Sequence, residues 1–183
     1  MLIGYFADGK WSHKALDLIL SSDQISVAFV CARYDNPDPI LREKAINLGI
    51  DFLVEKDINN SLFRQKLNNY ECDLFVSMSF NQIFEKLTFQ IPRNGTINCH
   101  AGKLPFYRGR NVLNWALIND EKEFGITVHF IDEGIDSGDI ILQKTYKIKD
   151  KDNYKTLLEK AYEECPKLLF QSIGMLINNN LKV

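Results

Sequence analysis

Short apolar runs alternate along the chain with stretches in which apolar residues recur at helical spacing. The apolar runs predict strands at residues 2–6, 25–32, 51–55, 72–78, 95–100, 124–132 and 138–149. The helical spacing predicts helices at residues 12–22, 40–49, 61–68, 110–120 and 153–179. Alternating strands and helices are typical of a mostly parallel sheet with helices on both faces. We therefore predict an α/β fold in one domain, residues 1–183, with a long C-terminal helix.

Local signals mark several of the expected element ends. Ser12 is expected to cap the helix at 12–22. Pro39 is expected to open the following helix, and Gly49 to end it. Pro166 lies within the last stretch and is expected to kink or interrupt that helix, unless two helices meet there. The partial alternation at 138–149 indicates a strand near the edge of the sheet.

Composition and charge restrict the partners that we expect. The 183 residues carry 22 Lys and Arg against 24 Asp and Glu, so the net charge is 22 − 24 = −2. This balance indicates neither nucleic acid nor a membrane as a partner, although a small anionic substrate remains compatible with it. No apolar run approaches the roughly 20 residues of a membrane span. With no secretory pattern at the N-terminus, we expect a cytoplasmic protein whose four cysteines are free thiols.

The carboxyl ends of the predicted strands are where a parallel sheet binds ligands. Asn98 and His100 close the strand at 95–100 and, two residues apart, point to the same side of it. An amide and an imidazole aimed at one point could stabilise a developing oxyanion and move a proton. On spacing alone, a purely structural role for both side chains is the favoured interpretation.

Asp136 makes a catalytic role for Asn98 and His100 more plausible. It lies in the acidic, glycine-containing loop 132–138, a composition typical of a solvated turn. A carboxylate beside the His100 imidazole would orient the ring, hold its charge and take part in proton transfer. Neighbouring strand ends would bring the two side chains together.

Other side chains near these strand ends have two interpretations each. Lys103 and Arg108 are either surface charges or binders of a substrate phosphate or carboxylate. Trp11 and His13 follow the first strand, where packing and ligand contact are both possible. His129 alternates with apolar neighbours and is interpreted as structural, or at most as a support for the residues of the site. The motifs of dinucleotide-binding proteins, P-loop proteins and nucleophile elbows do not occur. The metalloprotease motif HExxH and other strong metal-binding motifs do not occur either, so no metal is expected.

Two segments together resemble the N10-formyltetrahydrofolate-dependent formyltransferases. The sequence INCHAGKLPFYRG (97–109) resembles the family's N-x-H…L-P…R-G signature, and FGITVHFIDEGIDSGDII (124–141) resembles its second signature. The resemblance extends from about residue 73 to residue 147, since DLFVSMSFNQIF (73–84) is similar to the segment that holds the pterin. It implies a Rossmann-like formyltransferase fold, N10-formyltetrahydrofolate as co-substrate without a metal, and a catalytic trio of Asn98, His100 and Asp136.

The same resemblance implies two further groups of site residues. For the folate these are Met78, Ser79, Phe80, Asn81, Ile83, Asp132 and Gly134. For the acceptor substrate they are Trp11, His13, Lys103, Tyr107, Arg108 and Arg110. One departure from the family pattern is Gly102, because many members carry serine two places after the catalytic histidine.

The opening IGYFADGKWSHKAL and the phrase YRGRNVLNWALIND are most similar to the sugar N-formyltransferase branch. This implies an acceptor amine on a nucleotide-linked amino sugar and small-molecule partners, with a homodimer as one candidate assembly. Glycinamide ribonucleotide formyltransferases and methionyl-tRNA formyltransferases are the alternatives within the family. A formyltetrahydrofolate hydrolase and a non-catalytic folate- or partner-binding remnant of the fold also stay open.

Overall fold

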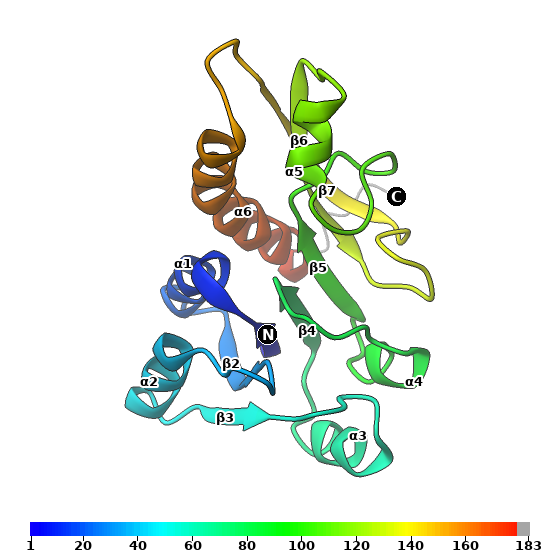
Figure 1. The fold of residues 1–183 in the computed structure, drawn as a ribbon. Coiled ribbons are helices and arrows are strands. Elements are labelled where there is room, and N and C mark those ends of the chain that lie inside the picture. Colours follow the sequence, from blue (N-terminus) through cyan, green and yellow to red (C-terminus); the bar gives the residue numbers. More distant parts are fainter. Residues whose placement is uncertain (179–183) are drawn as a thin grey trace. The chain divides into compact units, whose positions relative to one another are not determined.

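The structure, a computed structural model, describes residues 1–178 (Figure 1). The strands are β1 (Leu2–Ala7), β2 (Ser26–Ala32), β3 (Asp51–Val54), β4 (Leu74–Met78), β5 (Thr96–His100), β6 (Glu123–Phe130) and β7 (Ile140–Lys147). The helices are α1 (Gly9–Leu20), α2 (Pro39–Asn47), α3 (Ser61–Asn68), α4 (Lys86–Phe89), α5 (Val112–Ile118) and α6 (Tyr154–Ile177). The strand order is β3-β2-β1-β4-β5-β6-β7, and the chain divides into two compact units, Met1–Asn98 and Cys99–Val183.

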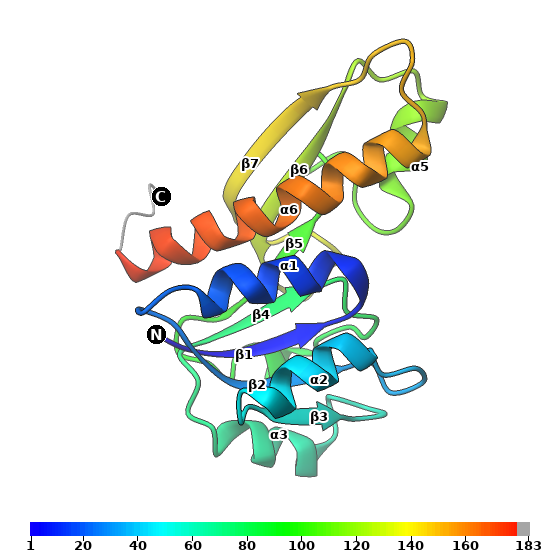
Figure 2. The same ribbon diagram turned by 90° about the vertical axis from the view of Figure 1, so that its left-hand side faces the viewer.

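The N-terminal unit, Met1–Asn98, is built on parallel strands. β1 pairs in parallel with β2 and with β4, and β2 pairs in parallel with β3. Helices α1 and α2 cover one face of these strands and α3 the other (Figures 1 and 2). Both faces are therefore covered, which explains why β1 and β4 are nearly continuous apolar runs.

An aromatic cluster fills the core of the N-terminal unit. Phe6 of β1 lies at its centre, with ring centroids 4.8–5.5 Å from those of Phe29, Phe75, Phe80 and Phe84, all edge-on. Edge-to-face contacts of this kind add to the stabilisation from apolar burial. The cluster fixes the carboxyl ends of β1 and β4, where the sequence predicts ligand-binding loops.

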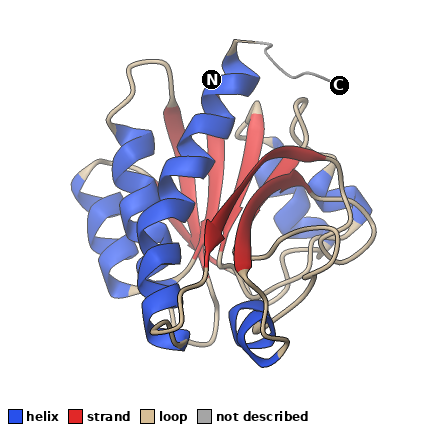
Figure 3. Cartoon of the chain, turned by 90° about the horizontal axis from the view of Figure 1, so that it is seen from above, coloured by secondary structure: helices blue, strands red, loops and turns tan. Residues whose placement is uncertain are grey.

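The C-terminal unit, Cys99–Val183, contains an antiparallel pair. β6 and β7 pair along their length, with an irregularity between Val128 and His129. Helix α6 packs on both strands, and α5 contacts β6 and α6 (Figure 2). As in the N-terminal unit, the strands lie on the inside and the helices outside (Figure 3). The half-buried and exposed positions of β7 agree with the edge position expected from its sequence.

The α/β fold with a mostly parallel sheet and a long C-terminal helix is confirmed. The helix at 61–68 matches α3, and Asp38 caps α2 just before Pro39, as the expected start of that helix requires. The prediction of a single domain stays a prediction.

One local expectation is wrong: Ser12 does not cap α1, which begins at Gly9, and the Ser12 hydroxyl lies within the first turn and donates to the Gly9 carbonyl at 2.6 Å. Pro166 lies inside α6, which runs through it as a single helix, so the helix is not interrupted there and the kink stays a prediction. The short helix α4 has no counterpart among the predicted elements, because four residues are too few to establish a helical period. Residue 179, the predicted end of the last helix, lies outside the described residues.

Candidate active site

Strand β5 carries the amide and the imidazole that the sequence singles out. Cys99, between them, directs its thiol toward α6, where the sulfur lies 3.6 Å from the Cys165 carbonyl oxygen. Because side chains alternate along a strand, Asn98 and His100 point to the side opposite α6. His100 is buried, with 9% of its surface exposed, although it stands at the end of the strand.

Asp136 lies beside His100. Its Oδ2 atom is 3.6 Å from Nδ1 of His100 and accepts a hydrogen bond from the Gly109 amide at 2.8 Å. Its Oδ1 atom is 3.4 Å from Nε2 of His129. The backbone of Asp136 is left-handed, with φ of 47°, a conformation that non-glycine residues adopt rarely and that is frequent at functional sites.

The second nitrogen of the His100 ring is also engaged. Nε2 lies 2.6 Å from the Tyr107 carbonyl oxygen, which can only accept, so this nitrogen carries the proton of the neutral ring. The loop 101–109 therefore returns to the strand end and contacts both His100 and Asp136 with its backbone. The backbone of this loop thus fixes the orientation of the His100 ring through the Tyr107 carbonyl.

Burial and nearby charges set the protonation of the pair. Burial lowers the pKa of His100, although the Asp136 carboxylate and the Tyr107 carbonyl oppose that shift. Burial alone would raise the pKa of Asp136, but the hydrogen bond from His129 and the neighbouring His100 outweigh it, and the pKa lies below its ordinary value. These shifts favour an ionised Asp136 carboxylate, and burial favours the neutral form of the His100 ring.

Gly102 is the position where this chain departs from the formyltransferase pattern, and the geometry gives a reason for glycine. A Cβ atom at this position would lie 2.3 Å from Nε2 of His100 and 2.3 Å from the Tyr107 carbonyl oxygen. Any larger residue would therefore displace the hydrogen bond between them. The absence of a side chain at Gly102 permits the close approach of the loop to the ring.

The loop that follows β5 holds the acceptor-substrate candidates of the C-terminal unit. Lys103 forms an ion pair with Glu123, and the Tyr107 hydroxyl donates to Glu121 at 2.6 Å. Arg108 and Arg110 are exposed. The structure thus engages Lys103 and Tyr107 in contacts of their own and presents the two arginines on the surface.

Asp132 shapes the loop that carries Asp136. Its Oδ1 atom accepts hydrogen bonds from the Gly134 amide at 3.0 Å and from the Ser137 hydroxyl at 2.6 Å. The Ser137 hydroxyl, followed by these backbone bonds, contributes to a lowered pKa of Asp132. Asp132 and Gly134, both implied by the resemblance, therefore define a tight turn beside Asp136.

The segment after β4 holds the remaining folate candidates, in the N-terminal unit. The Met78 side chain is buried in the core, whereas Ser79 is exposed and has a left-handed backbone with φ of 59°. Phe80 packs against Phe6, and Ile83 is 67% exposed. This segment therefore presents its backbone and Ile83, rather than Met78, to the surroundings.

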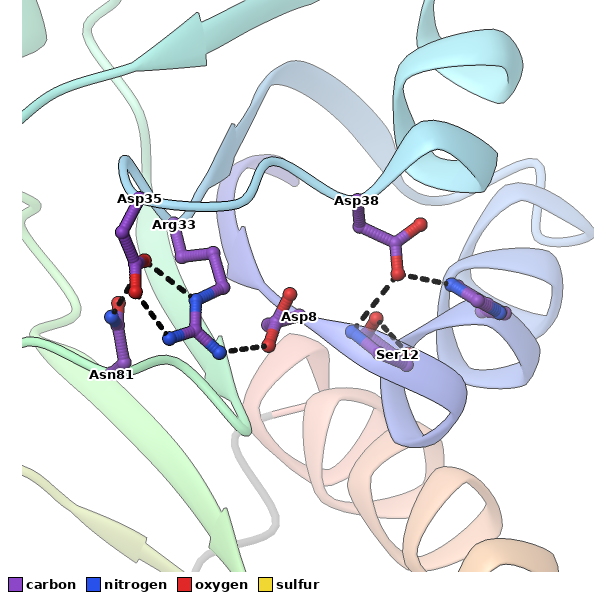
Figure 4. Close-up of polar contacts among 8 residues, drawn as sticks. Asp8, Ser12, Arg33, Asp35, Asp38 and Asn81 are labelled. Carbon is purple, nitrogen blue, oxygen red and sulfur yellow. Dashed lines mark hydrogen bonds and ion pairs between the residues drawn. The ribbon is translucent and has the colours of Figure 1, made fainter.

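A polar network, which sequence reasoning missed, occupies the carboxyl ends of β1 and β2 in the same unit (Figure 4). The Arg33 guanidinium binds both oxygens of Asp35, at 2.7 and 2.6 Å, and Oδ2 of Asp8 at 3.4 Å. The Asn81 amide donates to Asp35 at 3.4 Å. The only sequence signal was that Asp8 and Arg33 each stand directly after a buried strand.

Asp38 forms the other half of this arrangement and binds His13. Its Oδ2 atom lies 2.8 Å from Nε2 of His13 and accepts from the Gly9 amide at 3.1 Å. Its Oδ1 atom accepts from the amides of Ile40 and Leu41 at the start of α2. The sequence placed His13 among the candidates, and the structure joins it to a helix cap; Trp11, on the same helix, is half-buried.

Comparisons with known proteins identify the family of the chain. A sequence model of the family described as Formyl transferase matches residues 4–173. The chain is also 36% identical over 177 residues to a methionyl-tRNA formyltransferase of Thermodesulfovibrio yellowstonii, covering 92% of this chain and 57% of that protein. This chain belongs to the formyl transferase family.

Other formyl transferase relatives differ in their names and lengths. The Bifunctional polymyxin resistance protein ArnA of Wigglesworthia glossinidia brevipalpis is 33% identical over 141 residues, which cover 77% of this chain and 22% of that protein. The chain thus spans less than two thirds of the length of these curated relatives. Glycinamide ribonucleotide transformylase 1 from Symbiobacterium toebii has the same fold, with a TM-score of 0.85 and 24% identity over 98% of this chain and 88% of that chain.

No group of three or more His, Cys, Asp or Glu within residues 1–178 is arranged to hold a metal ion. None of the helices in the described part combines the length and apolar character required to cross a bilayer. The four cysteines are free thiols, as expected, and all are buried.

Proposed function

We propose that the protein transfers a formyl group from N10-formyltetrahydrofolate to a primary amine, with Asn98, His100 and Asp136 as its catalytic residues. The observation that carries the proposal is the buried His100–Asp136 pair at the end of β5, in a chain whose family match spans residues 4–173. Asn98, two residues before His100 on the same side of the strand, supplies an amide donor next to the ring.

The proposed reaction is an acyl transfer. The amine nitrogen attacks the formyl carbon, and the carbonyl oxygen becomes an oxyanion, which the Asn98 amide stabilises by a hydrogen bond and His100 by its charge once the ring is protonated. The amine loses one proton, which Asp136 accepts with His100 alongside it. Cleavage of the bond between the formyl carbon and N10 releases tetrahydrofolate, whose N10 receives a proton in turn. Protons therefore balance without an external acid or base.

We also propose where the folate is bound. In the N-terminal unit the backbone after β4, at Ser79, Phe80, Asn81 and Ile83, would bind the pterin. In the C-terminal unit the turn formed by Asp132 and Gly134 is the folate candidate. The exposed backbone at Ser79 and the exposed Ile83 side chain support this assignment. The buried Met78 would contribute through its neighbours in the chain rather than through its side chain.

The acceptor amine is where the sequence prediction and the comparisons diverge. The sequence resemblance favours a nucleotide-linked amino sugar. The relatives instead include methionyl-tRNA formyltransferases in the curated set and glycinamide ribonucleotide transformylases among the structures. These names favour methionyl-tRNA and glycinamide ribonucleotide over the sugar, and they keep a nucleic acid among the possible acceptors despite the near-neutral charge.

The test is a turnover assay with a panel of amines. The purified protein is mixed with N10-formyltetrahydrofolate and, separately, with methionyl-tRNA, glycinamide ribonucleotide, several nucleotide-linked amino sugars, or no amine. Tetrahydrofolate release is followed by absorbance and the product by its gain in mass. We expect release that depends on one acceptor class and is abolished in Asn98→Ala and His100→Ala.

Matched controls separate the possible outcomes. Lys122→Gln changes an exposed lysine that pairs with the exposed Asp120, so it should retain wild-type turnover. Release without any amine would indicate a hydrolase; one of the structural neighbours is a formyltetrahydrofolate deformylase. Folate binding without release under any condition would contradict the proposed transfer and leave a binding function.

A further inference from the structure

The segment between β4 and α4, residues 79–85 of the N-terminal unit, forms neither helix nor strand. The rings of Phe80 and Phe84 pack edge-on against Phe6, with centroids 5.5 and 4.8 Å from it, so the core fixes the segment at these two positions. Between them Ile83 is exposed and Gln82 is half-buried. The middle of the segment therefore needs polar contacts to hold one conformation.

The Gln82 side chain provides such contacts to the loop between β3 and α3. Its Oε1 atom accepts a hydrogen bond from the Ile58 amide at 3.0 Å, and its Nε2 atom donates to the Glu55 carbonyl at 2.8 Å. The oxygen must face the N–H group and the nitrogen the carbonyl, so a single orientation of the side-chain amide satisfies both bonds. One side chain thus pairs with two backbone groups of a distant loop.

Asn59 makes the same kind of contact in the opposite direction. Its Nδ2 atom donates to the Ile83 carbonyl at 2.9 Å, and its Oδ1 atom accepts from the Glu85 amide at 3.0 Å. Each of the two loops therefore contributes one amide side chain, one backbone N–H group and one backbone carbonyl. We call this reciprocal arrangement of Asn59 and Gln82 the amide clamp.

The loop that carries Asn59 is itself firmly held. The Ile58 side chain is completely buried. The Asn59 amide donates to Oδ1 of Asp57 at 2.9 Å, which closes a local turn. Asn60 caps α3 by accepting from the Phe63 amide at 2.8 Å. The amide clamp thus connects residues 82–85 to a loop whose conformation is fixed by the core and by a helix start.

We propose that Asn59 and Gln82 are positioning residues that hold the backbone of residues 81–85 in the conformation that binds the pterin of N10-formyltetrahydrofolate. A backbone that is ordered before the ligand arrives avoids the entropic cost of being ordered during binding. The amide clamp therefore raises the affinity for the co-substrate without touching it. The inference deepens the proposed function and rests on its assignment of the pterin to this segment.

The first test measures folate affinity in variants of each amide. Gln82→Met keeps the length of the side chain but removes the partner of the Ile58 amide and the Glu55 carbonyl. We expect the Kd for 5-formyltetrahydrofolate, a stable isomer of the co-substrate, to rise roughly 10-fold. Asn59→Ala should raise it less, roughly 3-fold, because both of its bonds lie at the surface. A calorimetric Kd that is unchanged in both variants would overturn the proposal.

Steady-state kinetics separate positioning from a direct part in the chemical step. In Gln82→Met the KM for N10-formyltetrahydrofolate should rise together with the Kd, whereas kcat and the KM for the amine should change little. A contact that acts on binding alone contributes equally to the ground state and the transition state, which leaves kcat unaffected. A fall in kcat at unchanged KM for the folate would contradict a positioning role.

Amide hydrogen exchange in the free protein reports on the amide clamp without any ligand. The Ile58 amide should exchange faster in Gln82→Met, and the Glu85 amide faster in Asn59→Ala. Unchanged exchange at both amides would overturn the amide clamp itself. If the wild-type protein binds folate but transfers no formyl group, the proposed transfer fails, and the differences in Kd still decide whether the amide clamp positions the segment.

Two control variants on α3 distinguish positioning from general effects. Asn68→Ala removes an amide whose Nδ2 atom donates to the Arg64 carbonyl at 2.9 Å within the helix, so it should leave the Kd and both exchange rates unchanged. Leu67→Val shortens a completely buried side chain and should lower the melting temperature without changing the Kd. A rise in Kd for Leu67→Val as large as that for Gln82→Met would show that overall stability, and not the amide clamp, controls folate affinity.

Discussion

Each unit of the molecule holds a histidine against an aspartate, and the two pairs differ in what else the carboxylate binds. In the N-terminal unit, His13 lies 2.8 Å from Asp38, whose oxygens also accept three backbone amides. In the C-terminal unit, the carboxylate of Asp136 is shared by one amide and two buried rings. Similar pairs therefore serve different ends: the first fixes a helix start, and the second sets the proton state of a ring.

Backbone conformation sharpens this difference. Asp38 has an extended backbone with φ of −63° and ψ of 118°, as helix-capping residues usually do. Asp136 has a left-handed backbone, which costs conformational energy that the surrounding contacts must offset. Such conformations are frequent at functional sites, which agrees with the chemical role proposed for Asp136. Changing the two aspartates should therefore affect different properties of the protein.

The largest expected effect is the loss of turnover in Asp136→Asn. The amide keeps the size of the side chain but cannot accept the amine proton or hold a charge on His100. We expect kcat to fall on the order of 10³- to 10⁴-fold, as when a histidine loses its carboxylate partner in other acyl transfers. Steady-state kinetics with the accepted amine measure the effect, with melting temperature as the control for folding. Wild-type turnover in a folded variant would remove Asp136 from the mechanism.

The second effect tests the loop that contacts the His100 ring. In Gly102→Ala the new Cβ would lie 2.3 Å from the Tyr107 carbonyl oxygen, and backbone cannot yield cheaply. The ring or the loop must therefore shift, and misplacement of a catalytic group by about 1 Å typically reduces the rate about 10²-fold. Kinetics and the His100 Nε2 signal in NMR would report it together. An unchanged Nε2 signal would show that the loop accommodates the methyl group.

The third effect belongs to the N-terminal unit and concerns stability. Asp38→Ala removes the acceptor for the amides of Ile40 and Leu41 and the partner of His13. We expect the free energy of unfolding to fall by about 1–2 kcal/mol, the usual effect of losing such a cap. Urea unfolding measures it. A loss of turnover on the Asp136→Asn scale, without loss of stability, would reverse the roles assigned to the two pairs.

The sequence predicted the scaffold well because covered parallel strands leave continuous apolar runs. It also predicted that Asp136 lies beside His100, through motif order and the rule that strand ends carry the site, whereas their chemical roles stay a prediction. It did not predict the contact of His129 with Asp136, because a histidine between Val128 and Phe130 has the pattern of a core position. This contact forms only because the loop 131–136 folds back onto β6, and the path of a loop leaves no periodic signal in the sequence.

The wrong expectation for Ser12 has a similar origin. Ser12 is a good capping residue by composition, yet α1 begins at Gly9, where the Gly9 amide donates to Asp38. The partner of the helix start thus lies 29 residues further along the chain. The network of Asp8, Arg33 and Asp35 escaped prediction for the same reason, since its members come together only once β1 and β2 pair.

The smallest effect is a pH dependence that should belong to Asp38. Burial alone would raise its pKa, but the Leu41 amide, His13 and the Ile40 amide outweigh burial, and the pKa lies below the ordinary 3.8. A carboxylate with a depressed pKa stabilises the fold above its unfolded-state pKa, and this contribution is lost as the pH falls through the folded-state pKa. The difference in unfolding free energy between wild type and Asp38→Ala should therefore be full near neutral pH and shrink below about pH 3.8.

Asp38→Asn, which keeps an acceptor for the helix amides but does not titrate, is the matched control. It should lie closer to wild type than Asp38→Ala does at low pH, because protonation of the wild-type carboxyl leaves a similar neutral acceptor. A difference between wild type and Asp38→Ala that stays constant through the acid range would mean that the cap acts through its oxygen atoms and not through its charge.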